Sequence, residues 1–346
     1  MEWVELVAAF ALILVSAELF TNALEWVGQS FGLSEGAVGS VLAAVGTALP
    51  ETLLPLVAIG FGASSGKEIG IGAILGAPLM LTTLAMFVLG VSTLLFARRG
   101  RRSSEIRGDR RVLLQDLGYF LAMYALALVA GLFHHAWFKW ALAAVLFVGY
   151  GFYVYRHFKS PGEKIEEREV VGEDLGPLRL RRLLVRFQRK PVSWSPSPPP
   201  WASVSQALIA LGGIVGGARV FVDGIDRVAH TFGVPELVLA LLIAPLATEL
   251  PEKFNSVLWV HRGKDTLALG NLTGAMVFQS SFPVSVGLLL TPWRLTGDAL
   301  VAALVALGAG SILWVTLRVR GSLGAKLLLA QGVIYGAYVA YVLARV

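Results

Sequence analysis

Ten stretches of this chain are long and apolar enough to cross a lipid bilayer. A bilayer core about 30 Å thick takes roughly 20 apolar residues in helical form. Of the 346 residues, 56% are hydrophobic and only 15% are charged, a balance typical of helical membrane proteins. We therefore expect an all-α polytopic membrane protein with about ten transmembrane helices. The stretches are roughly 3–27, 34–60, 68–96, 112–132, 137–155, 201–229, 234–260, 266–292, 297–317 and 323–345.

The distribution of basic residues predicts how the chain is oriented. Of the 29 Lys and Arg residues, seven lie between the third and fourth stretches and ten between the fifth and sixth. Cytoplasmic loops of membrane proteins carry such an excess of Lys and Arg. We expect a multi-pass protein of the cell membrane, in contact with lipid, with its N-terminus outside and the loop 156–200 in the cytoplasm. The net charge of +6 is thus a topology signal and indicates no nucleic-acid partner.

Two related motifs place a carboxylate beside a proline inside apolar stretches. The first is Gly46–Glu51, with the sequence GTALPE, and the second is Ala247–Glu252, with the sequence ATELPE. Proline removes a backbone donor and clashes with the preceding turn, so we expect both helices to be interrupted there. Freed carbonyl groups within a bilayer are tolerated only where they line a cavity or are buried in protein. A carboxylate at such a place is a functional-site hypothesis.

The two motifs belong to a repeat that covers both halves of the chain. At an offset of 201 residues, Thr47 aligns with Thr248 and Glu51 with Glu252, and after a short slip Gly72–Gly76 aligns with Gly270–Gly274. Five helices per half is an odd number, so the two halves would be inverted across the membrane. We expect two five-helix repeats, residues 1–155 and 201–346, joined by a charged, Pro-rich linker at 156–200. Inverted repeats with matched broken helices are typical of secondary transporters.

These residues resemble a known family. The motif ending Leu49-Pro50-Glu51, its echo ending Leu250-Pro251-Glu252, and the glycine-spaced Gly270–Gly274 are similar to the alpha-repeats of the calcium/cation antiporter superfamily, which includes the sodium/calcium exchangers. The resemblance implies that Glu51 and Glu252 coordinate Ca²⁺, with help from the backbone carbonyls of Thr47 and Thr248. Ca²⁺ prefers six to eight oxygen ligands in flexible geometry, which two carboxylates and freed carbonyls can supply.

The chain departs from the family pattern at several polar positions. Family members usually have serine after the motif threonine, where this chain has Ala48 and Glu249. The following stretch usually carries serines and asparagines that help hold Na⁺. The second repeat keeps Asn271, which we expect to be a ligand or to line the site. The first repeat lacks these groups; Ala73, Ala77, Pro78 and Leu81 stand there. The departures leave the divalent site intact but place the Na⁺ sites in doubt.

Glu249 has three interpretations. It is a direct metal ligand, a proton carrier that replaces lost Na⁺ sites, or one member of a buried ion pair with Lys253 or Arg219. Lys253 follows Glu249 by four residues, an orientation that favours pairing on a helix.

The remaining polar residues receive weaker assignments. Asp116 lies in a helix that we interpret as packing only, and Asp223 and Asp226 would lie at the outer mouth. Several groups along the eighth stretch would form interhelical hydrogen bonds, namely Thr273, Gln279, Ser280 and Ser281. The histidines show no ligand spacing and receive no function; they are His134, His135, His157, His230 and His261.

The sequence therefore predicts a secondary active antiporter and no enzyme, since hydrolase, phosphate-loop and metalloprotease motifs are missing. The transported ion would be Ca²⁺, exported by alternating access, with Na⁺ or H⁺ as coupling ion and no permanently bound cofactor. The resemblance implies that the first and sixth helices move against the rest. The alternative is a family derivative that does not exchange ions and acts as a cation channel, sensor or membrane scaffold.

Overall fold

A computed structural model describes residues 2–30, 43–62, 65–98, 100, 103–159, 178 and 198–345. Most of the predicted linker at 156–200 lies outside these residues. The elements are α1 (Glu2–Ser30), α3 (Ala43–Phe61), α4 (Gly66–Met80), the π-helix η2 (Leu81–Ala85), α5 (Met86–Arg98), β1 (Glu105–Ile106), α6 (Arg110–Leu132), α7 (Ala136–Lys159), α10 (Pro200–Phe232), α11 (Glu236–Thr248), α12 (Leu250–His261), α13 (Asp265–Leu290), α14 (Gly297–Arg320), β2 (Leu323–Gly324) and α15 (Ala325–Leu343).

The all-α polytopic membrane class is confirmed. Among the described residues, eight helical spans are long and apolar enough to cross a membrane. Two shorter apolar helices, Pro50–Phe61 and Glu236–Leu246, fall within the second and seventh predicted stretches. The count of ten transmembrane helices stays a prediction.

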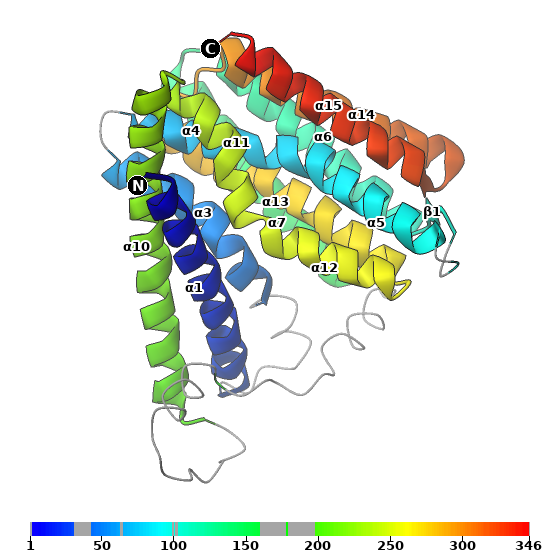
Figure 1. Ribbon diagram of the computed structural model, residues 1–346, viewed down its shortest axis with the longest axis horizontal. Helices are drawn as coiled ribbons and strands as arrows, with labels where there is room; N and C mark the ends of the chain where they lie inside the picture. The colour runs from blue at the N-terminus through cyan, green and yellow to red at the C-terminus, as the bar shows by residue number, and fades with distance from the viewer. Residues whose placement is uncertain are drawn as a thin grey trace. The chain divides into compact units, whose positions relative to one another are not determined.

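The chain forms two compact units. The first comprises Met1–Leu54 and Lys159–Gly224, and the second comprises Pro55–Phe158 and Ile225–Val346. In the first unit α1 and α10 lie side by side (Figure 1). Their core is formed by Ala17, Phe20, Ala210 and Ile214. A polar contact supports it, because Nε2 of Gln206 donates to the carbonyl of Leu19 at 2.8 Å.

Small residues on α10 allow α1 to approach closely, as is common between transmembrane helices. A Cβ added at Gly213 would collide with Ser16, and one added at Gly217 would lie 2.9 Å from Cγ1 of Ile13. At Gly224 the corresponding neighbour is Leu6, 2.8 Å away. Residues later in α10 contact residues earlier in α1, so the two helices are antiparallel. They are the first and sixth predicted stretches, and this direction fits the inverted repeat.

The second unit holds α4 to α7 and α11 to α15 around one apolar core. Helices α4 and α11 pack closely because glycines on α4 face backbone carbonyls of α11. A Cβ at Gly72 would collide with the carbonyl oxygen of Leu237, and one at Gly76 with that of Leu241. Residues later in α4 contact residues later in α11, so the two helices are parallel.

The third predicted stretch contains a π-helical turn shortly after Pro78. Helix α4 passes through Pro78, η2 spans Leu81–Ala85, and α5 continues the same span to Arg98. Pro78 supplies no N–H to the carbonyl four residues earlier, yet α4 continues through it, and the π-helix follows as a single turn inside the span. The hydroxyl of Thr82 donates to the carbonyl of Pro78 at 2.8 Å.

The expected interruption at Pro50 is wrong, because α3 is helical from Ala43 to Phe61. A proline removes one helical hydrogen bond, but the helix continues where the other bonds and neighbouring groups compensate. Near the proline, the hydroxyl of Thr52 donates to the carbonyl of Ala48 at 2.9 Å.

A two-stranded antiparallel pair ties the segment before α6 to the segment before α15. Glu105 pairs with Gly324, and Ile106 pairs with Leu323. The carboxylate of Glu105 accepts hydrogen bonds from Arg107 at 3.0 Å and from the hydroxyl of Ser322 at 3.3 Å. The side chain of Glu105 is thus hydrogen-bonded to a residue next to each of the two strands.

Candidate functional site

The second motif breaks its helix at a single residue. Helix α11 ends at Thr248, α12 begins at Leu250, and Glu249 between them has φ −97° and ψ 11°. Pro251 stands in the first turn of α12, where its missing N–H costs nothing. If α11 continued as one helix through this point, the ring of Pro251 would clash with the carbonyl group four residues earlier. The expected interruption of the seventh stretch is confirmed, and it lies beside the Pro-Glu pair.

Glu249 and Lys253 form a buried ion pair at this break. Oε2 of Glu249 lies 3.4 Å from Nζ of Lys253, and the side chains are 0% and 6% exposed. Of the interpretations open for Glu249, the structure thus shows the pairing with Lys253. Two charges taken out of water are stable together only when each compensates the other.

The ammonium group of Lys253 contacts three residues. Besides Glu249, it donates to Sδ of Met80 at 3.1 Å and to the carbonyl of Pro245 at 3.5 Å. Met80 ends α4 and Pro245 lies in the last turns of α11, so the ammonium group lies where these two parallel helices meet. Pro245 also deprives the carbonyl of Leu241 of its helical donor, and Gly76 packs against that carbonyl.

The predicted metal ligands occupy both units. Glu51 lies in α3 and is 6% exposed, and Thr248 ends α11 with the same exposed fraction. The backbone of Thr47 lies in α3 and that of Glu252 in α12, and both side chains fall outside the described part. Asn271, in α13, donates from Nδ2 to Oγ of Ser256 on α12 at 3.1 Å. Asn271 is therefore positioned against the helix that carries Glu252.

Helix α13 carries further polar groups, and most bond within the helix. Ser280 donates to the carbonyl of Val277 at 3.0 Å, and Ser281 donates to the same carbonyl at 2.6 Å. The expectation of interhelical hydrogen bonds is wrong for Ser280 and Ser281 in these contacts, which stay within α13. It is confirmed for Thr273, whose hydroxyl donates to Oδ2 of Asp116 on α6 at 2.6 Å. A helical serine often bonds the carbonyl one turn back, which competes with contacts to a neighbour.

Asp116 is a buried carboxylate that the sequence interpretation passed over. It is 2% exposed and also accepts a hydrogen bond from the Tyr153 hydroxyl of α7 at 3.0 Å. One carboxylate thus joins α6, α7 and α13. A lone acidic residue in a predicted transmembrane stretch was the available signal.

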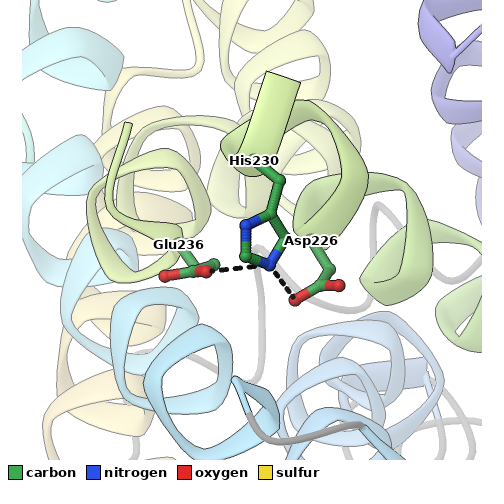
Figure 2. Close-up of side chains that lie close together, drawn as sticks. All are labelled: Asp226, His230 and Glu236. Atoms are coloured by element: carbon green, nitrogen blue, oxygen red, sulfur yellow. Dashed lines mark ion pairs between the residues drawn. The ribbon is translucent and has the colours of Figure 1, made fainter. Parts of the chain in front are cut away.

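A second cluster of ligand-type side chains lies at the junction of α10 and α11. Asp226, His230 and Glu236 each bring a possible ligand atom to within 4.8 Å of the others (Figure 2). The sequence indicated no function for His230, whose ring lies near two carboxylates in the folded chain. Asp226 is four residues away on the same helix, and Glu236 comes near through the turn between α10 and α11.

Comparisons with known proteins place the chain among ion exchangers. The family described as sodium/calcium exchanger protein matches residues 1–159 and 203–345. The putative antiporter CaxA of Alkalimonas amylolytica is 25% identical over 285 residues, which cover 81% of this chain and 78% of that protein. The inner membrane protein YrbG of Escherichia coli (strain K12) is 23% identical over 291 residues, covering 83% and 79%.

Solved structures share the fold. A crystal structure of the H⁺/Ca²⁺ exchanger CAX matches with a TM-score of 0.70 at 16% identity, covering 99% of this chain and 87% of that one. The sodium-calcium exchanger NCX_Mj, in crystals soaked with Na⁺ and Sr²⁺, matches with a TM-score of 0.54 at 22% identity. That match covers 98% of this chain and 99% of NCX_Mj.

Proposed function

The chain belongs to the sodium/calcium exchanger protein family, and from that premise we propose that it exports Ca²⁺ in exchange for Na⁺ or H⁺. The ion is held by Glu51 and Glu252, and transport proceeds by alternating access. The relatives support this proposal, since one is named a putative antiporter and a protein of the same fold is an H⁺/Ca²⁺ exchanger.

The observation that carries the proposal is the helix break beside the second Pro-Glu motif. Helix α11 ends at Thr248 and α12 restarts at Leu250, with Glu252 in its first turn. The end of a helix leaves carbonyl groups without helical partners, and these suit a hard cation. We assign the carbonyls of Thr248 and Thr47 as further ligands, and Asn271 as a residue that lines the site.

The surroundings of Glu249 favour H⁺ over Na⁺ as the coupling ion. A Na⁺ site requires oxygen ligands, yet the first repeat presents Ala73, Ala77 and Leu81, which are at most 6% exposed in an apolar core. In the second repeat the ammonium group of Lys253 already compensates Glu249 at 3.4 Å. A fixed positive charge beside a carboxylate opposes the entry of Na⁺. We therefore assign Glu249 as the partner of Lys253, with proton carriage as its alternative role and metal ligation as the third.

Transport in liposomes tests the proposal. Purified protein is reconstituted, and uptake of radioactive Ca²⁺ is measured against an outward H⁺ gradient, an outward Na⁺ gradient, or neither. We expect accumulation driven by the H⁺ gradient and lost in Glu51→Gln and in Glu252→Gln. The matched control is Glu68→Gln, the same change at an exposed carboxylate in the first turn of α4. Accumulation driven only by Na⁺ would reverse the choice of coupling ion.

Two results would overturn exchange itself. Ca²⁺ that equilibrates passively under every gradient would indicate a channel, and no flux in a well-folded preparation would indicate a sensor or scaffold. The role of Glu249 is read from the pH dependence of uptake. If Glu249→Gln transports Ca²⁺ with the pH profile of the unchanged protein, Glu249 is not the proton carrier.

A further inference from the structure

We propose that Asp226, His230 and Glu236 bind a divalent transition-metal ion, with Zn²⁺ as the best-fitting ion. This site is separate in sequence and in ligand chemistry from the Ca²⁺ ligands assigned above. It stands independently of the exchange activity.

Local structure brings the three side chains together. Asp226 and His230 are four residues apart on α10 and therefore share one face of the helix. The chain then turns back through Gly233, whose φ of +67° favours glycine, and through Pro235, which precedes the first residue of α11. That first residue is Glu236. The cluster is thus built within one short connection and lies entirely in the second unit.

The distances fit metal ligands better than hydrogen bonds. Nε2 of His230 lies 3.9 Å from Oδ1 of Asp226 and 3.7 Å from Oε1 of Glu236 (Figure 2). A hydrogen bond between such groups would measure about 2.7–3.2 Å. Ligand atoms at roughly 2.1 Å from one tetrahedral Zn²⁺ ion are about 3.4 Å apart. The two distances from His230 exceed this value by a few tenths of an ångström, and all three ligand atoms lie within 4.8 Å of one another, so small rotations of these side chains would bring them around one ion.

The donor set selects the class of metal. One imidazole nitrogen with two carboxylates suits Zn²⁺ and its first-row neighbours, while Ca²⁺ and Mg²⁺ prefer oxygen ligands alone. Three protein ligands leave a fourth position of a tetrahedral ion to water. The hydroxyl of Ser65 donates to Oδ1 of Asp226 and orients this carboxylate. Hydrogen-bonded carboxylates of this kind are usual next to metal sites.

The cluster is accessible from water. Helix α10 has 33 residues, which is roughly 50 Å at 1.5 Å per residue and exceeds a hydrocarbon core of about 30 Å. Asp226 and His230 lie in its last two turns, and the side chain of His230 is 72% exposed. With the predicted orientation of the chain, the site faces the outside of the cell. A bound ion would link the end of α10 to the start of α11 and, through Ser65, to the start of α4.

Binding of Zn²⁺ alone to the full-length protein tests the proposal. Protein without a histidine tag is titrated with ZnCl₂ in detergent, by calorimetry and by competition with a fluorescent chelator. We expect one saturable site whose affinity falls at least tenfold in Asp226→Asn, His230→Gln and Glu236→Gln. It is unchanged in His135→Gln and Asp223→Asn, which remove an exposed histidine and an exposed α10 carboxylate outside the cluster.

A second measurement separates loss of the site from loss of the fold. We expect Zn²⁺ to raise the unfolding temperature of the unchanged protein and of both controls, because an ion that binds only the folded state stabilises it. The three cluster variants should unfold at the same temperature with and without Zn²⁺. Binding must also persist in the Glu51→Gln and Glu252→Gln variants, which lack the proposed transport ligands. No saturable binding, or equal binding in the cluster variants, would overturn the proposal.

Discussion

Nζ of Lys253 lies 3.4 Å from Oε2 of Glu249, at the one-residue break between α11 and α12. Both side chains are buried, and the same ammonium group contacts Met80 and the carbonyl of Pro245. A positive charge that belongs to the chain is thus fixed on the residue that directly follows the proposed Ca²⁺ ligand Glu252.

The buried pair predicts a strong dependence of stability on both partners. Lys253→Met should lower the free energy of unfolding by about 3–5 kcal/mol, because it leaves Glu249 without compensation. Glu249→Gln combined with Lys253→Met should cost clearly less than the Lys253 change alone. Unfolding of the purified protein in detergent measures both, with the exposed Lys326→Met as the control. A double variant no more stable than Lys253→Met would contradict the pairing.

The close approach of α4 and α11 predicts that α4 tolerates no side chain at Gly76. Gly76→Ala forces a Cβ against the Leu241 carbonyl and should destabilise the protein by about 1–3 kcal/mol. At Gly308, in α14, an added Cβ meets nothing within 4 Å. Gly308→Ala should therefore be neutral or stabilise by up to about 1 kcal/mol. Equal unfolding temperatures for the two variants would argue against the close crossing.

The Asp116 network predicts coupled contributions from three helices. Tyr153→Phe and Thr273→Val each remove a hydrogen bond to this buried carboxylate and should each cost roughly 1–3 kcal/mol. In an Asp116→Leu background the same changes should have little effect, since their shared partner is gone. Unfolding by a denaturing detergent measures this cycle, with the exposed Tyr155→Phe as control. Additive losses would show that the three groups do not act together.

The β1–β2 pair predicts a pH dependence in the loop before α6. Hydrogen bonding and charge attraction from Arg107, and a hydrogen bond from Ser322, lower the pKa of Glu105 below its ordinary value of 4.5. Glu105 therefore stabilises the pair above pH 4.5, and this contribution is lost as the pH falls through the lowered pKa.

Amide hydrogen exchange at Ile106 and Leu323 checks this prediction, after correction for the intrinsic pH dependence of exchange. Protection should be constant above pH 4.5 and decrease below it. In Glu105→Gln it should be lower and independent of pH over the same range. The same fall in protection in Glu105→Gln would assign the effect to another group.

The transmembrane class could be predicted from the sequence because the apolar stretches are long and separated by charged loops. The break after Thr248 was predictable from Pro251, but the same argument failed at Pro50. Glu249 beside Pro251 is paired with Lys253 at the break, whereas the corresponding residues of the first motif, Ala48 and Thr52, carry no charge and α3 continues. The proline alone therefore does not decide whether the helix breaks.

The polar contacts between distant segments were the least predictable part. Asp116 lies 157 residues from Thr273, and only the packing of α6 against α13 joins them. His230 lies near Asp226, which is close to it in sequence, and near Glu236, which the turn at Gly233 brings close to it. Local spacing could suggest the first neighbour but not the second.

The π-helical turn η2 lets a single span serve two sets of partners. With about 3.6 residues per turn, one extra residue rotates everything after it by roughly 100° around the helix axis. Before η2, Gly76 of α4 packs against α11; after it, Gly90 of α5 faces α15, where an added Cβ would lie 2.7 Å from Cβ of Leu328. Helix α15 lies alongside α5 (Figure 1). Length in this stretch therefore matters more than composition. A chain one residue shorter between Leu81 and Ala85 would turn the glycines of one half away from their neighbour, whatever side chains it kept.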